Sequence, residues 1–172
     1  MTTAVQPRIG SNRFLLKKDT HEIGLILNRF QENTRCRSVL LIDEAGHLVS
    51  KHGEDTSPRE ATVIALLAGT FQTTRRLSRL LGAKEFSSRV DCGMRDLMML
   101  QVGDDALLAI TLGDESTSTL VRTYALESIR RLEKVFHGAA ERSEESALEE
   151  SGWKGNDTFA RAVTDRLDAL FG

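Results

Sequence analysis

The stretch from Ser57 to Gly82 constrains the fold most, because it carries the boundary signals of one long helix. Ser57 is a suitable N-cap residue and Pro58 fits the first turn. Gly82 fits the position just after the last turn. About 24 residues lie between these signals, which corresponds to roughly 36 Å of helix at 1.5 Å per residue. We therefore expect the other elements to be arranged around a helix over 57–82.

This helix has two unlike faces when its residues are spaced at 100°. One face is mostly apolar, and we expect it to pack on a sheet or a core: Val63, Leu66, Leu67, Thr70, Thr74, Leu77 and Leu81. The opposite face begins with small residues and continues with polar and basic ones: Ala61, Ala65, Ala68 and Gly69, then Gln72, Arg75, Arg76 and Arg79. Ile64 and Phe71 lie on the border between the two faces.

The small side chains of the second face indicate a contact with another helix. Gly69 costs ~1 kcal/mol relative to alanine in a helix interior, and close approach of a second backbone would offset this cost. The simplest partner is the same helix of a second copy, so the pattern predicts a homodimer. The alternative is that the alanines are only good helix formers on an exposed surface.

Composition places the chain among ordinary globular proteins, with one domain and tails. Its 172 residues are 28% charged and 40% hydrophobic. The net charge of −2 gives no indication of a nucleic-acid partner. No apolar run approaches the ~18 residues of a membrane span, and the first residues lack the apolar segment of a signal peptide. We therefore expect a cytoplasmic protein with no membrane insertion.

The chain lacks the motifs of common active sites and cofactor sites. It contains neither a Gly-rich phosphate loop nor a GxSxG nucleophile motif. Cys36 and Cys92 match no metal or redox spacing, so we expect reduced, partly buried thiols. The histidines are scattered: His21, His47, His52 and His137. These patterns predict an interaction protein that is not an enzyme and holds no metal or cofactor.

Apolar spacing and turn residues predict the element order α-β-β-α-β-β-β-α. A first helix is expected over about 19–34, with Asp19 and Glu22 forming a capping box. The expected strands are 38–42, 47–50, 86–91, 95–102 and 106–112, and the last core helix is 118–136. The hairpins make a five-stranded, mostly antiparallel sheet whose faces the helices must cover. The fold class is therefore an α+β layered domain.

The two ends of the chain differ in composition from this domain. Residues 1–18 are expected to be flexible, the domain to cover 19–137, and residues 138–156 to form a flexible linker. Residues 157–172 have an amphipathic helical pattern formed by Phe159, Val163, Leu167, Leu170 and Phe171. A helix this short is marginal in water, so we expect it to dock into a groove of a partner protein. The alternative is that it folds back on its own domain.

Three segments carry a family resemblance that covers about residues 19–137. They are LLIDEAGHLVS, then ALLAGTF with LSRLLGAKEFS, and then VGDDALLAITLGDESTSTLVR. Together they resemble the Roadblock / dynein light-chain family, and within it the bacterial MglB-type polarity proteins. The last residues, DRLDALFG, resemble the short helix that closes such proteins. The resemblance implies a Roadblock/longin-like fold and a homodimer formed through the central helices and an edge strand.

The resemblance also implies a function. MglB-type proteins bind the small Ras-like GTPase MglA, activate its GTP hydrolysis and assist nucleotide exchange through the C-terminal helix. The expected role is therefore regulation of such a GTPase in bacterial cell polarity or motility. One alternative is a dimeric adaptor that recruits a GTPase or another protein without altering its turnover. Another is an enzyme or small-molecule sensor that uses the open face of the sheet.

Site residues follow from the matched segments. The dimer contact falls at Ala65, Ala68 and Gly69, together with Ala61 on the same face. The GTPase platform falls at Phe71, Gln72, Arg75, Arg76 and Arg79, and the mobile contact at the apolar residues of 157–172. Two departures from the family concern Gln72–Arg76, where small residues are usual, and Thr119, which replaces a frequent glycine. The first departure permits an arginine supplied in trans, or a dimer ion pair between Arg76 and Glu60 of the partner subunit.

Overall fold

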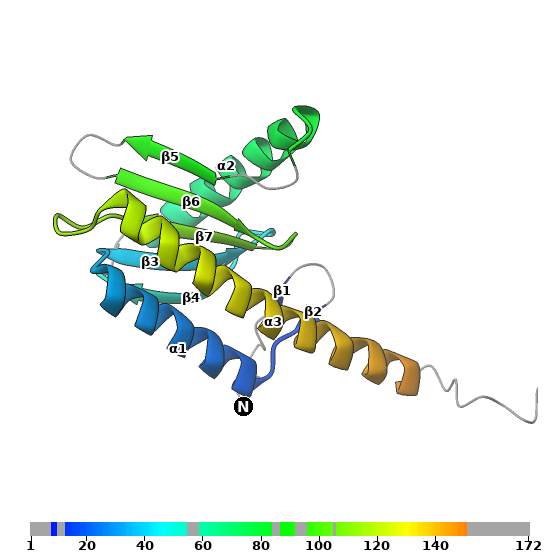
Figure 1. The fold of residues 1–172 in the computed structure, drawn as a ribbon. Helices are drawn as coiled ribbons and strands as arrows, with labels where there is room; N and C mark the ends of the chain where they lie inside the picture. Colours follow the sequence, from blue (N-terminus) through cyan, green and yellow to red (C-terminus); the bar gives the residue numbers. More distant parts are fainter. Residues whose placement is uncertain are drawn as a thin grey trace, which may run out of the picture. The chain divides into compact units, whose positions relative to one another are not determined.

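The computed structural model describes residues 8–9, 13–54, 59–83, 87–91, 96–104 and 106–150. The chain divides into two units, Met1–Ala140 and Glu141–Gly172, and the fold below is that of the first. Its elements are β1 (Arg8–Ile9), β2 (Arg13–Phe14), α1 (Lys17–Thr34), β3 (Ser38–Asp43), β4 (Leu48–Gly53), α2 (Glu60–Leu80), β5 (Ser87–Asp91), β6 (Asp96–Val102), β7 (Ala106–Thr111) and α3 (Ser118–Glu150) (Figure 1). From α1 onward this is the predicted order, so the α+β fold class is confirmed.

The sheet has the strand order β4-β3-β7-β6-β5, and all four pairings are antiparallel. Its centre is the pair β3–β7, in which Leu40 lies opposite Ala109 and Leu41 opposite Leu108. Every residue of β3 is buried, because helices cover both faces of the sheet. The central strands β3 and β7 therefore appear in the sequence as nearly continuous apolar runs, whereas the edge strands β4 and β5 contain polar and charged residues.

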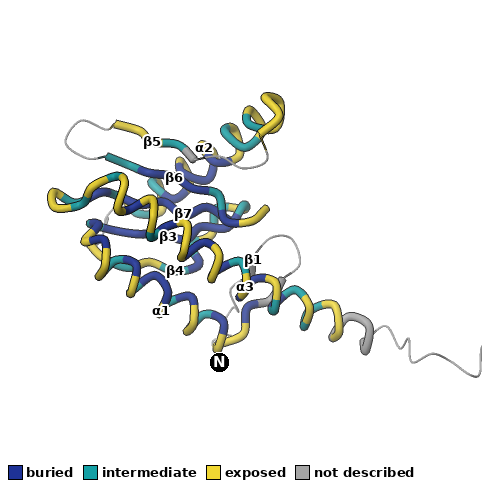
Figure 2. The backbone as a smooth tube through the Cα atoms, in the orientation of Figure 1, coloured by how far each residue is buried: buried dark blue, intermediate teal, exposed yellow. Residues whose placement is uncertain are grey.

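Two layers of helix enclose the sheet, and each forms its own hydrophobic core (Figure 1). On one face, α1 and the first part of α3 pack against side chains such as Val39 and Leu41. On the other face, α2 packs against Leu40 and Ile42. Neighbouring residues of β3 therefore belong to different cores, as the period of two in a strand requires. Figure 2 shows the buried central strands β3, β7 and β6 between these helices.

The N-terminal region differs from its prediction. Residues 8–9 and 13–14 pair as a short antiparallel hairpin within the segment expected to be flexible. α1 begins at Lys17, two residues before the predicted start, and Leu15 is buried in the core. Asp19 is consequently the third residue of the helix instead of its cap. Its Oδ2 accepts a hydrogen bond of 2.9 Å from the backbone N–H of Leu16, which is one half of a capping box.

α2 has the predicted C-terminal signal but not the predicted inward face. Gly82 follows the helix with φ of +78°, as expected for a glycine after the last turn. The proposed cap at Ser57 lies outside the described residues. The buried residues are Ile64, Leu67, Ala68 and Phe71. The inward face is therefore centred on the two residues assigned to the border, and Leu66 and Leu77 face outward.

α3 continues to Glu150, well past the predicted end at residue 136. The segment 138–150 is helical, so the prediction of a flexible linker is wrong for these residues. Alanine and glutamate make up eight of the thirteen residues of this segment, and both favour a helix strongly enough to accommodate Gly138. The rest of the expected linker and the expected helix over 157–172 lie outside the described residues. Within the described part of the chain, no helix combines the length and apolar character needed to cross a membrane.

Candidate protein-interaction site

The outer side of α2 carries an exposed apolar stripe. We define this stripe as Leu66, Gly69, Thr73, Leu77 and Leu80. Leu66 is 67% exposed and Leu80 is 79% exposed, which is unusual for leucines on a helix that already packs against a core. The hydroxyl of Thr73 donates to the carbonyl of Gly69 at 2.9 Å, so the helix itself uses this donor. The stripe is therefore a second, uncovered apolar face of α2.

A groove of about 740 Å³ lies along the flank of this stripe. The second half of α2 forms most of it, and Glu44 from the β3–β4 turn forms the remainder. The lining residues are Glu44, Gln72, Thr73, Arg75, Arg76, Leu77, Arg79 and Leu80. Three guanidinium groups and one carboxylate thus share the groove with two leucines. This combination of cationic and apolar side chains suits a protein partner better than a small ligand.

The β3–β4 turn places Glu44 beside α2. Asp43 closes the turn, because its Oδ1 accepts from the backbone N–H of His47 at 2.7 Å and its Oδ2 lies 2.9 Å from His47 Nδ1. Gly46 has φ of +87°, and a Cβ at this position would lie 3.2 Å from the Cβ of Ala68. The turn therefore rests directly on α2. Gln72 strengthens the contact by donating to the carbonyl of Glu44 at 2.9 Å.

Arg75 is fixed within the fold. Its Nη1 donates to Glu44 Oε2 at 3.4 Å, and its Cζ lies 5.9 Å from the centroid of the Phe71 ring. Only 13% of the Arg75 side chain is exposed. Its Nε is buried and has no hydrogen-bond partner among the described residues. Arg75 therefore acts mainly as a bridge between α2 and the β3–β4 turn.

Arg76 and Arg79 are held far less firmly. Arg79 Nη2 lies 3.7 Å from Asp104 Oδ1, and both side chains are more than half exposed. An exposed pair at this distance contributes little to stability. Arg76 is exposed and forms no ion pair within the described part of the chain. Both guanidinium groups are therefore available to a partner.

The residues predicted for a dimer contact divide into two groups. Ala61, Ala65, Gly69 and Arg76 are exposed, as that prediction requires. Ala68 is only 8% exposed and packs against the chain's own sheet, so a contact with a twin subunit at Ala68 is wrong for this fold. Glu60 forms an ion pair of 2.6 Å with Lys51. This pair competes with the predicted pairing of Glu60 and Arg76 across a dimer.

The residues predicted for a partner platform also divide. Gln72, Arg75, Arg76 and Arg79 line the groove together. Phe71 is fully buried in the core, so it can act on a partner only through Arg75, which lies over its ring. The predicted contacts in the tail are Phe159, Val163, Leu167, Leu170 and Phe171, and they lie outside the described residues. Glu44 was not predicted, because a turn residue 28 positions before Gln72 has no local sequence signal of this contact.

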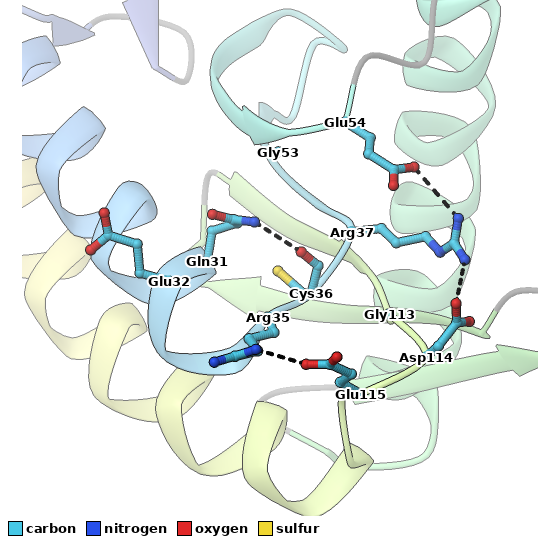
Figure 3. A pocket seen from close by; sticks show the side chains of 10 residues that line it. All are labelled: Gln31, Glu32, Arg35, Cys36, Arg37, Gly53, Glu54, Gly113, Asp114 and Glu115. Carbon is cyan, nitrogen blue, oxygen red and sulfur yellow. Dashed lines mark hydrogen bonds and ion pairs between the residues drawn. The ribbon is translucent and has the colours of Figure 1, made fainter.

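A second concavity, of about 700 Å³, lies at the opposite end of β3 (Figure 3). Arg35 Nη1 lies 2.9 Å from Glu115 Oε2, and Arg37 Nη2 lies 2.9 Å from Asp114 Oδ2. The hydrogen bond that Arg37 donates to the Asp114 carboxylate raises the pKa of Arg37 above its ordinary value. The two arginines of this concavity thus pair with carboxylates of the same concavity and join the α1–β3 connection to the β7–α3 connection. We interpret the arrangement as a structural clamp.

The same concavity holds the buried thiol of Cys36. Cys36 is 1% exposed, and burial raises the pKa of its thiol. Gln31 Nε2 donates to the carbonyl of Cys36 at 3.2 Å, which fixes the local backbone. Among the described residues, no three His, Cys, Asp or Glu side chains are grouped so that they could hold a metal ion.

Solved structures of known proteins share this fold at low sequence identity. MglB of Myxococcus xanthus has a TM-score of 0.67 and 22% identity, over 73% of this chain and 95% of that one. The gliding protein MglB of Thermus thermophilus has a TM-score of 0.65 and 21% identity, over 74% and 97% of the two chains. An MglB with a tetrameric arrangement has a TM-score of 0.66 and 21% identity, over 74% and 96%. No curated protein matches this chain.

A family model identifies the domain that these structures share. The Roadblock/LC7 domain matches residues 22–112, which is more than half of the 172 residues. The match extends from α1 to the end of β7 and includes both α2 and the β3–β4 turn that form the groove. The chain therefore belongs to the Roadblock/LC7 domain family.

Proposed function

We propose that two copies of this chain form a homodimer through α2, and that the dimer regulates a small Ras-like GTPase of the MglA type. The observation that carries the proposal is the exposed apolar stripe of α2 beside a groove with two exposed guanidinium groups. The structural likeness to MglB proteins supports it, since one of them is named as a gliding protein and another has a tetrameric arrangement. The regulated process would be cytoplasmic, in cell polarity or motility.

The first half of α2 offers the contact for the proposed dimer. Thr62, Leu66 and Gly69 are exposed and recur at intervals of four and three residues, a spacing that keeps one seam of a helix against another helix. Arg76, Leu77 and Leu80 lie beyond this seam and remain in the groove. A Cβ added to Gly69 would meet no atom within 4 Å in the single chain, so the space above this glycine is open for a second backbone.

The proposed mechanism is preferential binding to one switch state of the GTPase. A regulator shifts a conformational equilibrium only by the difference in its affinities for the two states. Such a protein needs no active site of its own. In this proposal the groove residues Gln72, Arg76 and Arg79 contact the GTPase, and Arg75 positions the groove wall. The residues of 157–172 provide a further contact that assists nucleotide exchange.

Single-turnover GTP hydrolysis tests the function directly. The Ras-like GTPase of the source organism is loaded with GTP, and phosphate release is measured with and without this protein. We expect faster release with the intact protein and no release from this protein alone. Binding of the GTPase without any change in hydrolysis or exchange would assign the adaptor role and would contradict the regulatory proposal.

Removal of residues 156–172 tests the role assigned to the tail. We expect the shortened chain to remain a dimer and to bind the GTPase or promote exchange less well. Dissociation of the dimer on this truncation would show that the segment belongs to the fold instead.

A further inference from the structure

We propose that the groove of α2 binds an acidic, leucine-bearing helical segment of the partner protein, and that Arg76 and Arg79 select it by charge. This proposal rests on the proposed function in assigning the segment to a GTPase. The chemistry of the groove also stands by itself, because it follows from the lining residues. The inference adds the charge of the partner segment and separate roles for the three arginines.

The first argument is the balance of charges. Among the described residues, three guanidinium groups line the groove against the single carboxylate of Glu44. The chain as a whole has a net charge of −2, so the excess of positive charge in the groove is opposite in sign to the net charge of the chain. Positive charge at a contact attracts negative charge on the partner and sets the orientation in which the two associate.

The second argument is the apolar part of the lining. Leu77 and Leu80 lie in the same groove as the arginines, and both are more than half exposed. Exposed leucines beside cations match a helix that has apolar residues along one side and carboxylates next to them. They do not match a nucleic-acid backbone, which presents phosphates without an apolar surface.

The third argument is the different restraint on each arginine. Glu44 and the Phe71 ring hold Arg75, so moving it to a partner would break two contacts. Arg79 can exchange the exposed carboxylate of Asp104 for a partner carboxylate at little cost. Arg76 has no described carboxylate to give up. We therefore assign selection of the acidic segment to Arg76 and Arg79, and we assign Arg75 to positioning the groove wall.

The lining also argues against a free phosphate or nucleotide as the occupant. Phosphate sites in proteins commonly use backbone N–H groups at the N-terminus of a helix. This groove is formed by the C-terminal half of α2 and by one turn residue. That half of a helix carries the negative end of its dipole, which favours the arginine side chains themselves and not an added phosphate.

Two probes test the inference with the full-length protein. The first is the Ras-like GTPase of the source organism, with affinity measured by calorimetry. The second is a labelled helical peptide of alanine, leucine and glutamate, measured by fluorescence anisotropy, with the matching lysine peptide as its counterpart. The protein variants are Arg79→Glu and the double variant Arg76→Glu with Arg79→Glu. Arg122→Glu on α3 is the control, since Arg122 is also exposed but lies across the sheet from the groove.

We expect the acidic peptide and the GTPase to bind the unchanged protein and the Arg122→Glu variant equally well. The double variant should bind both probes about tenfold more weakly, because two favourable charge contacts become repulsive. Raising the salt concentration from about 50 to about 300 mM should weaken binding for the same reason. Light scattering shows whether each variant keeps its oligomeric state. If the double variant changes its oligomeric state, binding is compared between the unchanged protein and the Arg79→Glu variant alone.

The outcomes separate the two proposals. GTPase binding that the groove variants leave unchanged would overturn the inference and leave the proposed function standing. Arginine-dependent binding of the acidic peptide without any binding of the GTPase would support the inference and overturn the proposed function. Equal binding of the acidic and lysine peptides would contradict charge selection by the groove.

Discussion

Arg75 Nη1 lies 3.4 Å from Glu44 Oε2, and this contact joins two residues that are 31 positions apart in the chain. Glu44 belongs to the turn between β3 and β4, and Arg75 lies in the second half of α2. The pair therefore fixes the end of α2 that extends beyond its packed half. The shape of the groove depends on this contact, since both residues line the groove.

Replacing Glu44 with glutamine should weaken this connection. We expect Glu44→Gln to lower the free energy of unfolding by about 1 kcal/mol, because a partly buried guanidinium loses its counter-charge. Urea denaturation followed by circular dichroism measures this change. Glu127→Gln is the matched control, because Glu127 pairs with Arg131 on an exposed surface and its loss should have an effect below about 0.5 kcal/mol. Equal effects of the two substitutions would contradict a fixed groove wall.

A charged residue within the apolar stripe should separate the proposed dimer. We expect Leu66→Lys to give a folded monomer, because Leu66 is largely exposed in the single chain and its replacement leaves the core intact. The mass in solution follows from light scattering, and the fold from circular dichroism. Leu25→Lys on α1 provides the control, since Leu25 is exposed but lies away from α2. A dimer that persists in Leu66→Lys would exclude α2 as the interface.

The sequence predicts the central strands β3, β6 and β7 well because burial on both faces gives them a mostly apolar pattern. The runs that became β6 and β7 contain few polar residues, and no amphipathic helix of that length would have such a composition. Met98 and Met99 then enter opposite cores, as their alternation in a strand requires. The predicted element boundaries in the sheet differ from the observed ones by only a few residues.

The orientation of α2 could not be settled in the same way, because both of its faces are apolar. Leu66 and Leu77 were assigned to the core on hydrophobicity, whereas the sheet is covered by Ile64, Leu67 and Phe71. A helix that covers a sheet on one side and carries an exposed apolar stripe on the other has no single hydrophobic direction. Which face of α2 packs on the sheet depends on where the β3–β4 turn meets the helix. That meeting is a tertiary contact, which a local sequence pattern does not contain.

Long-range charge pairs were missed for a related reason. Arg37 and Asp114 are 77 positions apart and meet only because β3 pairs with β7. A local charge pattern cannot indicate such a contact. The pairing of Arg75 with Glu44 was missed on the same grounds, although Arg75 itself was recognised as part of the site.

Gly53 should not tolerate a side chain. It has φ of +96°, and a Cβ would overlap the backbone carbonyl oxygen of Arg37, which cannot move without disturbing β3. We expect Gly53→Ala to destabilise the protein by more than about 2 kcal/mol, as measured by thermal or urea unfolding. Gly103→Ala is the comparison, because Gly103 also has a positive φ of +55° but its Cβ would lie in open space. A cost near about 1 kcal/mol is expected there.

Cys36 should react slowly with alkylating reagents while the protein is folded. Its thiol is buried, and burial raises its pKa above the ordinary value of 9.0, so very little thiolate exists at pH 8. Mass spectrometry of the Cys36 peptide after treatment with iodoacetamide measures the rate, and urea should increase this rate strongly. Because the pKa is raised in the folded state, the unfolded thiol ionises first as the pH rises above 9.0. The thiol therefore lowers the free energy of unfolding only in that alkaline range. Rapid labelling of the folded protein at pH 8 would contradict this burial.

Phe71 should contribute to stability and not to direct contact with a partner. Its side chain is fully buried between α2 and the sheet, so Phe71→Ala would leave a cavity and should cost about 3–5 kcal/mol. Urea denaturation measures this loss, and Leu126→Ala on the exposed side of α3 should cost far less.

Phe71→Leu keeps most of the buried volume but removes the ring beneath Arg75. We expect this variant to stay folded and to bind the acidic peptide with nearly unchanged affinity, because Arg76 and Arg79 remain in place. A tenfold loss of affinity in Phe71→Leu at unchanged stability would show instead that the ring under Arg75 takes part in recognition.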